Sequence, residues 1–282
     1  MGKKRGYKLG DRPDELQKAI DQIVEVKKDK EKRVSEMKVE RQKAQGDHQK
    51  KLLAAVVMGV MLTSFVYSAV QMGWMRLGDP AALAEAMASP ETANALKLDG
   101  ERLGTVPSEI SSLSKLRVLT LDSNELKSLP PDLGKLSELQ TLSVSYNELV
   151  DLPKEFATLG RLSVLKLKAN RLTTVPSVVG TLAELKELEL SNNRLGGLPP
   201  EIGNLKKLEI LRLRGNPIPI LPAELTNLHN LTELDLAGTQ LSTLPDPKNF
   251  PRLRRLSLRG TKVDEATVAS YEKTIPKVSI QR

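Results

Sequence analysis

Hydrophobic residues between positions 93 and 263 recur with a period of twenty-three. Each period contains a Leu-x-Leu pair, whose alternation predicts a short strand with one buried face, and a row of apolar residues spaced by three. One example is the row Val179, Leu182 and Leu185, which precedes the pair Leu188 and Leu190. A single period is too short to enclose these side chains, so we predict that successive units stack and bury them between neighbours.

Proline and asparagine return at fixed offsets in the same frame. Seven prolines, each twenty-three residues after the one before, are Pro107, Pro130, Pro153, Pro176, Pro199, Pro222 and Pro245. The last position of the unit is held by Asn124, Asn147, Asn170, Asn193 and Asn216, and later by Thr239 and Thr261. The unit therefore reads LxxLPxxIxxLxxLxxLxLxxN. Because proline fixes φ and lacks an N–H donor, we expect it in an extended convex segment outside any helix interior.

Over residues 93–263 the sequence resembles the leucine-rich repeat family, in its twenty-three-residue class with a Leu-Pro step. The resemblance implies an α/β solenoid whose short parallel strands form a concave face. It also implies that the five asparagines form a structural ladder, in which each buried amide bonds backbone groups of adjacent turns. The two threonines can replace only part of that ladder.

Both ends of the repeat region have predicted caps. Residues 76–92 read as a linker and a short helix, whose Leu83 and Met87 would cover the first turn. Residues 264–282 read as a C-terminal cap that closes the other end.

Within that C-terminal cap, Asp264 is a predicted helix N-cap with Val268 and Tyr271 directed inward, followed by a strand-like pair, Val278 and Ile280. Just before the cap, the spacing from Leu231 to Leu253 falls to twenty-two. We therefore expect one residue fewer on the convex side of that unit.

Upstream, residues 52–75 contain no charged residue. A helix of this length reaches about 36 Å, which exceeds a hydrocarbon core of about 30 Å. We predict a single transmembrane helix in preference to a buried helix or a cleaved signal peptide, because some fifty residues precede the apolar stretch. Six basic residues lie shortly before it: Arg33, Lys38, Arg41, Lys43, Lys50 and Lys51. Only Arg76 follows closely, so the positive-inside rule predicts a cytoplasmic N-terminus and periplasmic or extracellular repeats.

Residues 1–51 are predicted to form a charged helical segment in the cytoplasm. They carry sixteen basic and ten acidic residues, interleaved, with Tyr7 as the only aromatic residue, so we predict no nucleic-acid binding. A weak heptad pattern favours a coiled coil, while a single helix near anionic lipid headgroups is an equal alternative. Self-association through this helix, or through small residues such as Gly59 in the apolar stretch, stays open.

The composition argues against catalysis. The chain has no cysteine and only two histidines, His48 and His229, which are far apart in the sequence. No phosphate-binding glycine loop is present, so we predict a protein that is not an enzyme and needs no cofactor or metal. Cysteine-bracketed caps, which the resemblance links to eukaryotic extracellular members, are missing, and this favours a bacterial or intracellular origin.

Candidate binding residues come from the concave positions of successive strands: Tyr146, Lys166, Lys168, Glu187, Glu189, Asn192, Arg212, Arg214 and Asp235. Charges alternate along the row of Lys166, Glu189, Arg212 and Asp235, and parallel neighbours lie about 4.8 Å apart. We predict a cross-strand ion-pair ladder that needs no ligand. The alternative is a mixed-charge wall that binds a partner, with Tyr146 as an anchor together with Asn192.

The resemblance implies a binding module for a protein partner on the concave face. The sequence therefore predicts a single-pass membrane-anchored protein that mediates protein recognition outside the cytoplasm. Two alternatives remain: a structural subunit of an envelope-spanning assembly, and a cytoplasm-facing signalling scaffold with reversed topology.

Overall fold

The computed structural model describes residue 83 and residues 86–282. The predicted charged segment at residues 1–51 and the predicted transmembrane helix at residues 52–75 lie outside the described residues, as does most of the linker before the repeats. In the described part of the chain, no helix combines the length and apolarity needed to cross a membrane.

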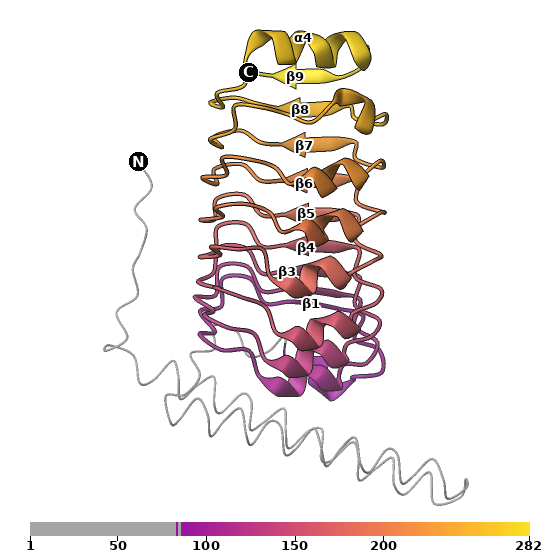
Figure 1. Ribbon diagram of the computed structural model, residues 1–282. Helices are drawn as coiled ribbons and strands as arrows, with labels where there is room; N and C mark the ends of the chain where they lie inside the picture. Colours follow the sequence, from indigo (N-terminus) through magenta and orange to yellow (C-terminus); the bar gives the residue numbers. More distant parts are fainter. Residues whose placement is uncertain (1–82, 84–85) are drawn as a thin grey trace, which may run out of the picture. The chain divides into compact units, whose positions relative to one another are not determined.

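Nine three-residue strands in the described region form one parallel sheet, in sequence order (Figure 1). Neighbouring strands pair residues of equivalent repeat position, such as Leu142 with Leu165. The strands are β1 (Ala95–Lys97), β2 (Val118–Thr120), β3 (Thr141–Ser143), β4 (Val164–Lys166), β5 (Glu187–Glu189), β6 (Ile210–Arg212), β7 (Glu233–Asp235), β8 (Arg255–Ser257) and β9 (Ser279–Gln281). The predicted parallel solenoid is thus confirmed.

The connections on the convex side are 3-10 helices rather than the α-helices that an α/β class suggests. They are η1 (Ser108–Ser112), η2 (Pro131–Lys135), η3 (Lys154–Thr158), η4 (Ser177–Thr181), η5 (Pro200–Asn204), η6 (Ala223–Asn227) and η7 (Pro247–Asn249). Each is too short for an α-helical ladder, and its end closes by an i→i+3 bond, as when the Leu136 N–H donates to the Leu133 carbonyl at 3.1 Å.

Six of the seven recurring prolines, from Pro107 to Pro222, lie directly before the helices η1 to η6. Pro130, for example, has φ −69° and ψ 138°, which is extended backbone. The ring has no N–H, so no backbone donor is lost at the helix start. Neighbouring helices also approach closely: a Cβ atom on Gly203 would lie 2.6 Å from the Glu224 carbonyl oxygen, so only glycine fits there.

The apolar residues of all units form one continuous core. In the unit that the sequence pattern singled out, Val179, Leu182, Leu185, Leu188 and Leu190 are each at most 1% exposed. The core runs from the N-terminal cap to the C-terminal cap without interruption. Stacking therefore buries what no single unit could enclose, as predicted.

Both ends of this core are covered. At the N-terminal end Leu83 and Met87 are 3% and 8% exposed. At the other end α4 (Glu265–Thr274) begins after Asp264, whose carboxylate accepts a hydrogen bond from the Thr267 N–H at 2.8 Å. Val268 and Tyr271 are buried on its inner face.

The Tyr271 hydroxyl donates to the Pro245 carbonyl at 2.8 Å, which joins α4 to the last repeat. Burial raises the pKa of this phenol, so it stays a donor at neutral pH. The strand β9 then completes the sheet at the position predicted from Val278 and Ile280.

The unit with the shortened spacing, Leu231 to Leu253, shows where the missing residue belongs. Its convex helix η7 has three residues, whereas η1 to η6 have five each. Asp246 rather than a proline caps it, and accepts from the Lys248 N–H at 2.9 Å. The repeat therefore shortens on the convex side, as expected, while strand register is kept.

Candidate binding surface on the concave face

The strands place the charged candidate residues side by side on the concave face. The register pairs Lys166 with Glu189, Glu189 with Arg212, and Arg212 with Asp235. Their side chains alternate with buried leucines, because successive residues of a strand point to opposite faces.

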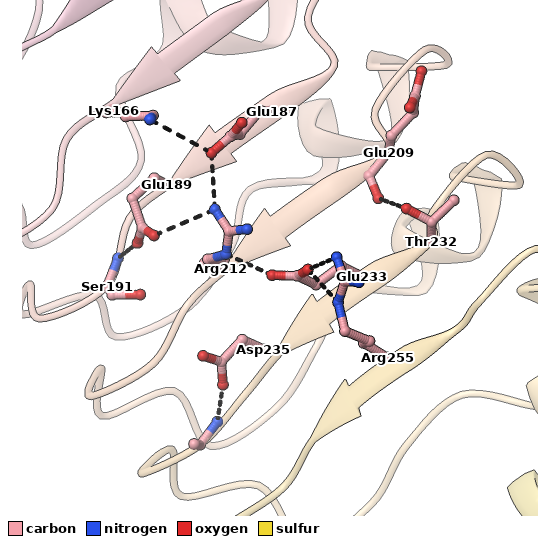
Figure 2. Close-up of polar contacts among 11 residues, drawn as sticks. Lys166, Glu187, Glu189, Ser191, Glu209, Arg212, Thr232, Glu233, Asp235 and Arg255 are labelled. Carbon is pink, nitrogen blue, oxygen red and sulfur yellow. Dashed lines mark hydrogen bonds and ion pairs between the residues drawn. The ribbon is translucent and has the colours of Figure 1, made fainter. Parts of the chain in front are cut away.

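Arg212 is the centre of the ion pairs on this face (Figure 2). Its Nε atom lies 2.6 Å from Glu233 Oε1, and its Nη1 atom lies 2.8 Å from Glu187 Oε1 and 3.8 Å from Glu189 Oε2. A planar guanidinium can contact several carboxylates at once because its five donors point in fixed, divergent directions.

Two further cations extend these contacts. Lys166 Nζ lies 4.0 Å from Glu187 Oε1, and Arg255 Nε donates to Glu233 Oε2 at 2.6 Å. We name this set the Arg212 network: Lys166, Glu187, Glu189, Arg212, Glu233 and Arg255. Within the described residues, no buried side-chain nitrogen or oxygen lacks a hydrogen-bond partner.

The ion pairs follow the predicted row at only one of its three steps, between Glu189 and Arg212. No ion pair joins Lys166 to Glu189, or Arg212 to Asp235, in the part of the chain that the structure describes. Glu189, besides its contact with Arg212, accepts from the Ser191 N–H at 2.8 Å, and Asp235 accepts from the Ala237 N–H at 3.0 Å. The long arginine leans along its strand toward the preceding row, where it meets Glu187 and Glu233.

The network is held in a partly dehydrated environment. The Arg212 side chain is 28% exposed, and that of Glu233 is 13% exposed. Burial alone would lower the pKa of Arg212, but hydrogen bonds and charge attraction from Glu233 and Glu187 outweigh it and raise that pKa. Burial would likewise raise the pKa of Glu233, yet its bonds with Arg212 and Arg255 lower it.

The first strands carry a different polar arrangement, which sequence reasoning missed. Asp99 accepts from the Thr120 hydroxyl and from the Asp122 N–H, both at 2.8 Å. One repeat later, Asp122 accepts from the Ser143 hydroxyl at 2.7 Å and the Ser145 N–H at 2.6 Å. The sequence does contain a pattern that could have predicted this arrangement. In both repeats an aspartate follows the Leu-x-Leu pair, and a hydroxyl residue lies twenty-one positions further on.

Four candidate residues lie beside the Arg212 network and take no part in it; we name them the concave rim: Tyr146, Lys168, Asn192 and Arg214. Tyr146 is 52% exposed, and Lys168 Nζ lies 5.2 Å from the centre of its ring, a cation–π contact. Asn192 and Arg214 are also exposed. Among the described residues, no carboxylate forms an ion pair with Lys168 or Arg214.

A left-handed turn presents two of these rim residues. Tyr146 and Asn192 have φ values of 56° and 57°, at the position just before the ladder asparagine. Glycine holds that position in later units, with φ 70° at Gly215 and 69° at Gly238. Glycines that recur one repeat apart could have predicted this left-handed turn from the sequence. The pattern is hard to recognise because serine, tyrosine and alanine hold the same position in earlier units.

The ladder asparagines lie directly behind this turn and are buried. Asn193 Nδ2 donates to the Leu167 and Leu190 carbonyls, both at 2.9 Å, and its Oδ1 accepts from the Leu172 N–H at 3.1 Å. Equivalent contacts to adjacent turns are made by Asn124, Asn147, Asn170 and Asn216.

The replacement at the end of the ladder makes fewer bonds. The Thr239 hydroxyl donates only to the Leu236 carbonyl, at 2.7 Å.

Regarding metals, the described residues contain no group of three or more histidine, aspartate or glutamate side chains that could hold an ion.

Comparisons with known proteins agree with this architecture. Residues 96–194 match a model described as a leucine-rich repeat region, and residues 183–241 match a leucine-rich repeat model. A solved structure of a leucine-rich repeat protein from Leptospira interrogans is similar, with 28% identity and a TM-score of 0.57. That match covers 68% of this chain and 61% of the other. No curated protein matches the chain.

The repeat solenoid with its asparagine ladder defines a class of protein, and the two matching models name it. The chain is a leucine-rich repeat protein. Domains of this kind generally mediate protein–protein interaction, and the family is typically non-catalytic.

Proposed function

We propose that this chain is a single-pass membrane protein whose concave rim recognises an acidic segment of a partner protein outside the cytoplasm. The observation that carries this proposal is that Tyr146, Lys168 and Arg214 offer an exposed ring and two cations beside the Arg212 network, whose charges are already paired with one another. An exposed aromatic side chain next to cations is a favourable anchor for a partner that brings carboxylates.

The Arg212 network is the less favourable contact surface. A partner that used Glu187 or Glu233 would first have to separate each from Arg212, and would lose hydrogen bonds of 2.8 and 2.6 Å. Charge-assisted hydrogen bonds contribute about 1.5–3 kcal/mol each, so little net affinity would remain. We therefore assign the network to the rigidity of the wall and the concave rim to recognition.

The membrane part of the proposal is supported by the sequence. The uncharged stretch at residues 52–75 is long enough to span a bilayer, and basic residues are concentrated before it. With this orientation, the repeats lie on the side of the membrane opposite the cytoplasm.

The recognition surface is tested by Tyr146→Ala and Lys168→Ala in the full-length chain. Each should weaken capture of the membrane partner by about 1–2 kcal/mol, because each removes part of an exposed anchor. The melting temperature should change little, since Ala169 already adopts φ 54° at the position equivalent to Tyr146. Capture is measured by pull-down with identification by mass spectrometry, followed by affinity with the purified partner.

Lys127→Ala is the matched control, because Lys127 is an exposed cation outside the concave rim. It should capture the partner like the unaltered protein. Full retention of the partner by both rim variants would overturn the proposed site and favour the alternative of a structural spacer in an envelope assembly.

Orientation is tested by protease accessibility in cells with a permeabilised outer layer. The residues beyond about 76 should be digested or released as one compact fragment, while residues 1–51 stay protected. The opposite pattern, with protected repeats and a digested N-terminus, would contradict this orientation and support the cytoplasm-facing scaffold.

A further inference from the structure

The C-terminal end of the solenoid carries a concentrated positive charge. Residues 246–282 contain nine basic and four acidic residues, a surplus of five. The preceding repeats, residues 101–245, contain sixteen basic and seventeen acidic residues and are nearly neutral. The positive charge of the repeat domain is therefore concentrated at its C-terminal end, the end at which α4 lies (Figure 1).

Most of these cations have no carboxylate partner. Among the described residues, Arg255 pairs with Glu233 and Arg282 pairs with Glu265, while the other seven basic residues of this end form no ion pair. Arg252 donates to the Asn230 side chain at 2.7 Å instead. The positive charge of this end is thus largely available to a ligand.

Three of the available cations surround one cavity of about 470 Å³. Lys248 comes from η7, Arg254 precedes β8, and Lys277 follows α4. The cavity lies beside the shortened convex helix η7, where α4 takes the place of a further repeat. Its size is within the range of about 300–1,000 Å³ that is typical of ligand pockets.

The rest of the lining is mainly apolar. Pro247 and Ile275 are buried, and Pro251 and Pro276 add exposed apolar surface. The C-terminus of α4 brings a partial negative charge of about half a unit, which the three cations exceed. A ligand that fits would combine carboxylates with a short aliphatic side chain.

We propose that this pocket, formed by Lys248, Arg254, Lys277, Pro247 and Ile275, binds an acidic peptide segment of a partner protein. The segment places its carboxylates against the three cations and an aliphatic side chain against the exposed apolar surface of Pro251 and Pro276. This site lies outside the concave rim, and it does not depend on the function assigned to the rim.

Other anionic partners fit less well. The lining contains no aromatic side chain, so nucleic-acid bases would find no stacking surface. A lipid bilayer presents a broad plane of headgroups, whereas these cations border a recess that an individual side chain can enter.

The test is calorimetric titration of the full-length chain with a capped EELEE peptide and with its uncharged analogue QQLQQ. The acidic peptide should bind saturably and QQLQQ should not. Lys248→Glu and Lys277→Glu should each weaken EELEE binding by about tenfold or more, because each replaces a charge-assisted contact with a repulsive one.

Lys262→Glu makes the same change in net charge at an exposed lysine outside the pocket, and should weaken binding by less than about threefold. Because the concave rim is proposed to recognise an acidic segment as well, the titrations are repeated in a Lys168→Ala background, where Lys248→Glu and Lys277→Glu should still weaken EELEE binding by about tenfold. If Lys262→Glu weakens EELEE binding as much as the pocket variants do, the effect is one of net charge, and the proposal that the peptide binds in this pocket is contradicted. Binding to vesicles that contain phosphatidylserine, with none to EELEE, would identify a lipid ligand and overturn the peptide.

Discussion

Asn193→Ala is expected to destabilise the repeat domain by about 3 kcal/mol or more, as measured by urea denaturation followed by circular dichroism. The substitution removes a buried amide and leaves the Leu172 N–H without a partner. The Leu167 and Leu190 carbonyls each lose a bond of 2.9 Å but still accept from Asn170 Nδ2 and Asn216 Nδ2, both at 3.0 Å. Each buried polar group left unsatisfied costs about 1–3 kcal/mol, and a small cavity adds to the loss.

Asn193→Thr should fall between the alanine variant and the unaltered protein. A threonine at this position keeps one donor, as Thr239 does toward the Leu236 carbonyl, but it cannot reach the N–H group of the preceding turn. Arg194→Ala, at an exposed neighbour whose side chain forms no hydrogen bond or ion pair in the described structure, should change stability by less than about 0.5 kcal/mol. If Asn193→Ala lowers the free energy of unfolding by less than about 1 kcal/mol, water replaces the hydrogen bonds of the Asn193 amide and the expected role of the ladder is contradicted.

The same repeat frame explains why much of the fold could be predicted from the sequence. Burial at Leu188 and Leu190 follows from periodicity, because each unit must lend its apolar face to the next. The inward amide at Asn193 is what the resemblance to leucine-rich repeats implied, and the buried Tyr271 follows from the helix pattern of the C-terminal cap. The shortened helix η7 likewise follows from one missing residue.

The repeat pattern did not predict that the convex segments form 3-10 helices rather than α-helices. It depends on how few residues remain between a proline such as Pro130 and the next strand, and on close approaches such as that of Gly203 to Glu224. Periodicity shows which residues are buried, but it does not report the backbone path between them.

Of the ion pairs predicted along the row, only that of Glu189 with Arg212 is present, and the shorter contacts of Arg212 are with Glu187 and Glu233. Strand pairing places Arg212 beside Glu189 and Asp235, yet both carboxylates accept backbone N–H bonds from their own chain two residues further on. Partner choice is decided by side-chain length and by competing local donors, which a repeat alignment does not contain.

Arg212→Ala is expected to cost about 2 kcal/mol of stability at pH 7, more than an isolated surface pair. The guanidinium is 28% exposed, and its loss leaves three carboxylates, those of Glu187, Glu189 and Glu233, facing one another without their common cation. Thermal and urea denaturation of the full-length chain measure the loss. Arg212→Lys should lose less, because it keeps the charge while giving up the fork of donors.

The cost should also depend on pH. The pKa of Glu233 is lowered in the folded state from its ordinary value of 4.5, so its carboxylate contributes stability above that pH. The contribution is lost as the pH falls through the lowered folded value. The stability difference between the unaltered protein and Arg212→Ala should therefore be largest near neutral pH and shrink below about pH 4.

Binding measurements then distinguish the two roles assigned to the concave face, which are rigidity and partner recognition. If the Arg212 network only stiffens the concave face, Arg212→Ala lowers the melting temperature but captures the partner at temperatures where the variant stays folded. Tyr146→Ala should show the reverse, with lost capture and little change in melting. A folded Arg212→Ala variant that fails to capture the partner would move the recognition site from the concave rim to the network, because only direct contact with Arg212 or its carboxylates would then explain the loss.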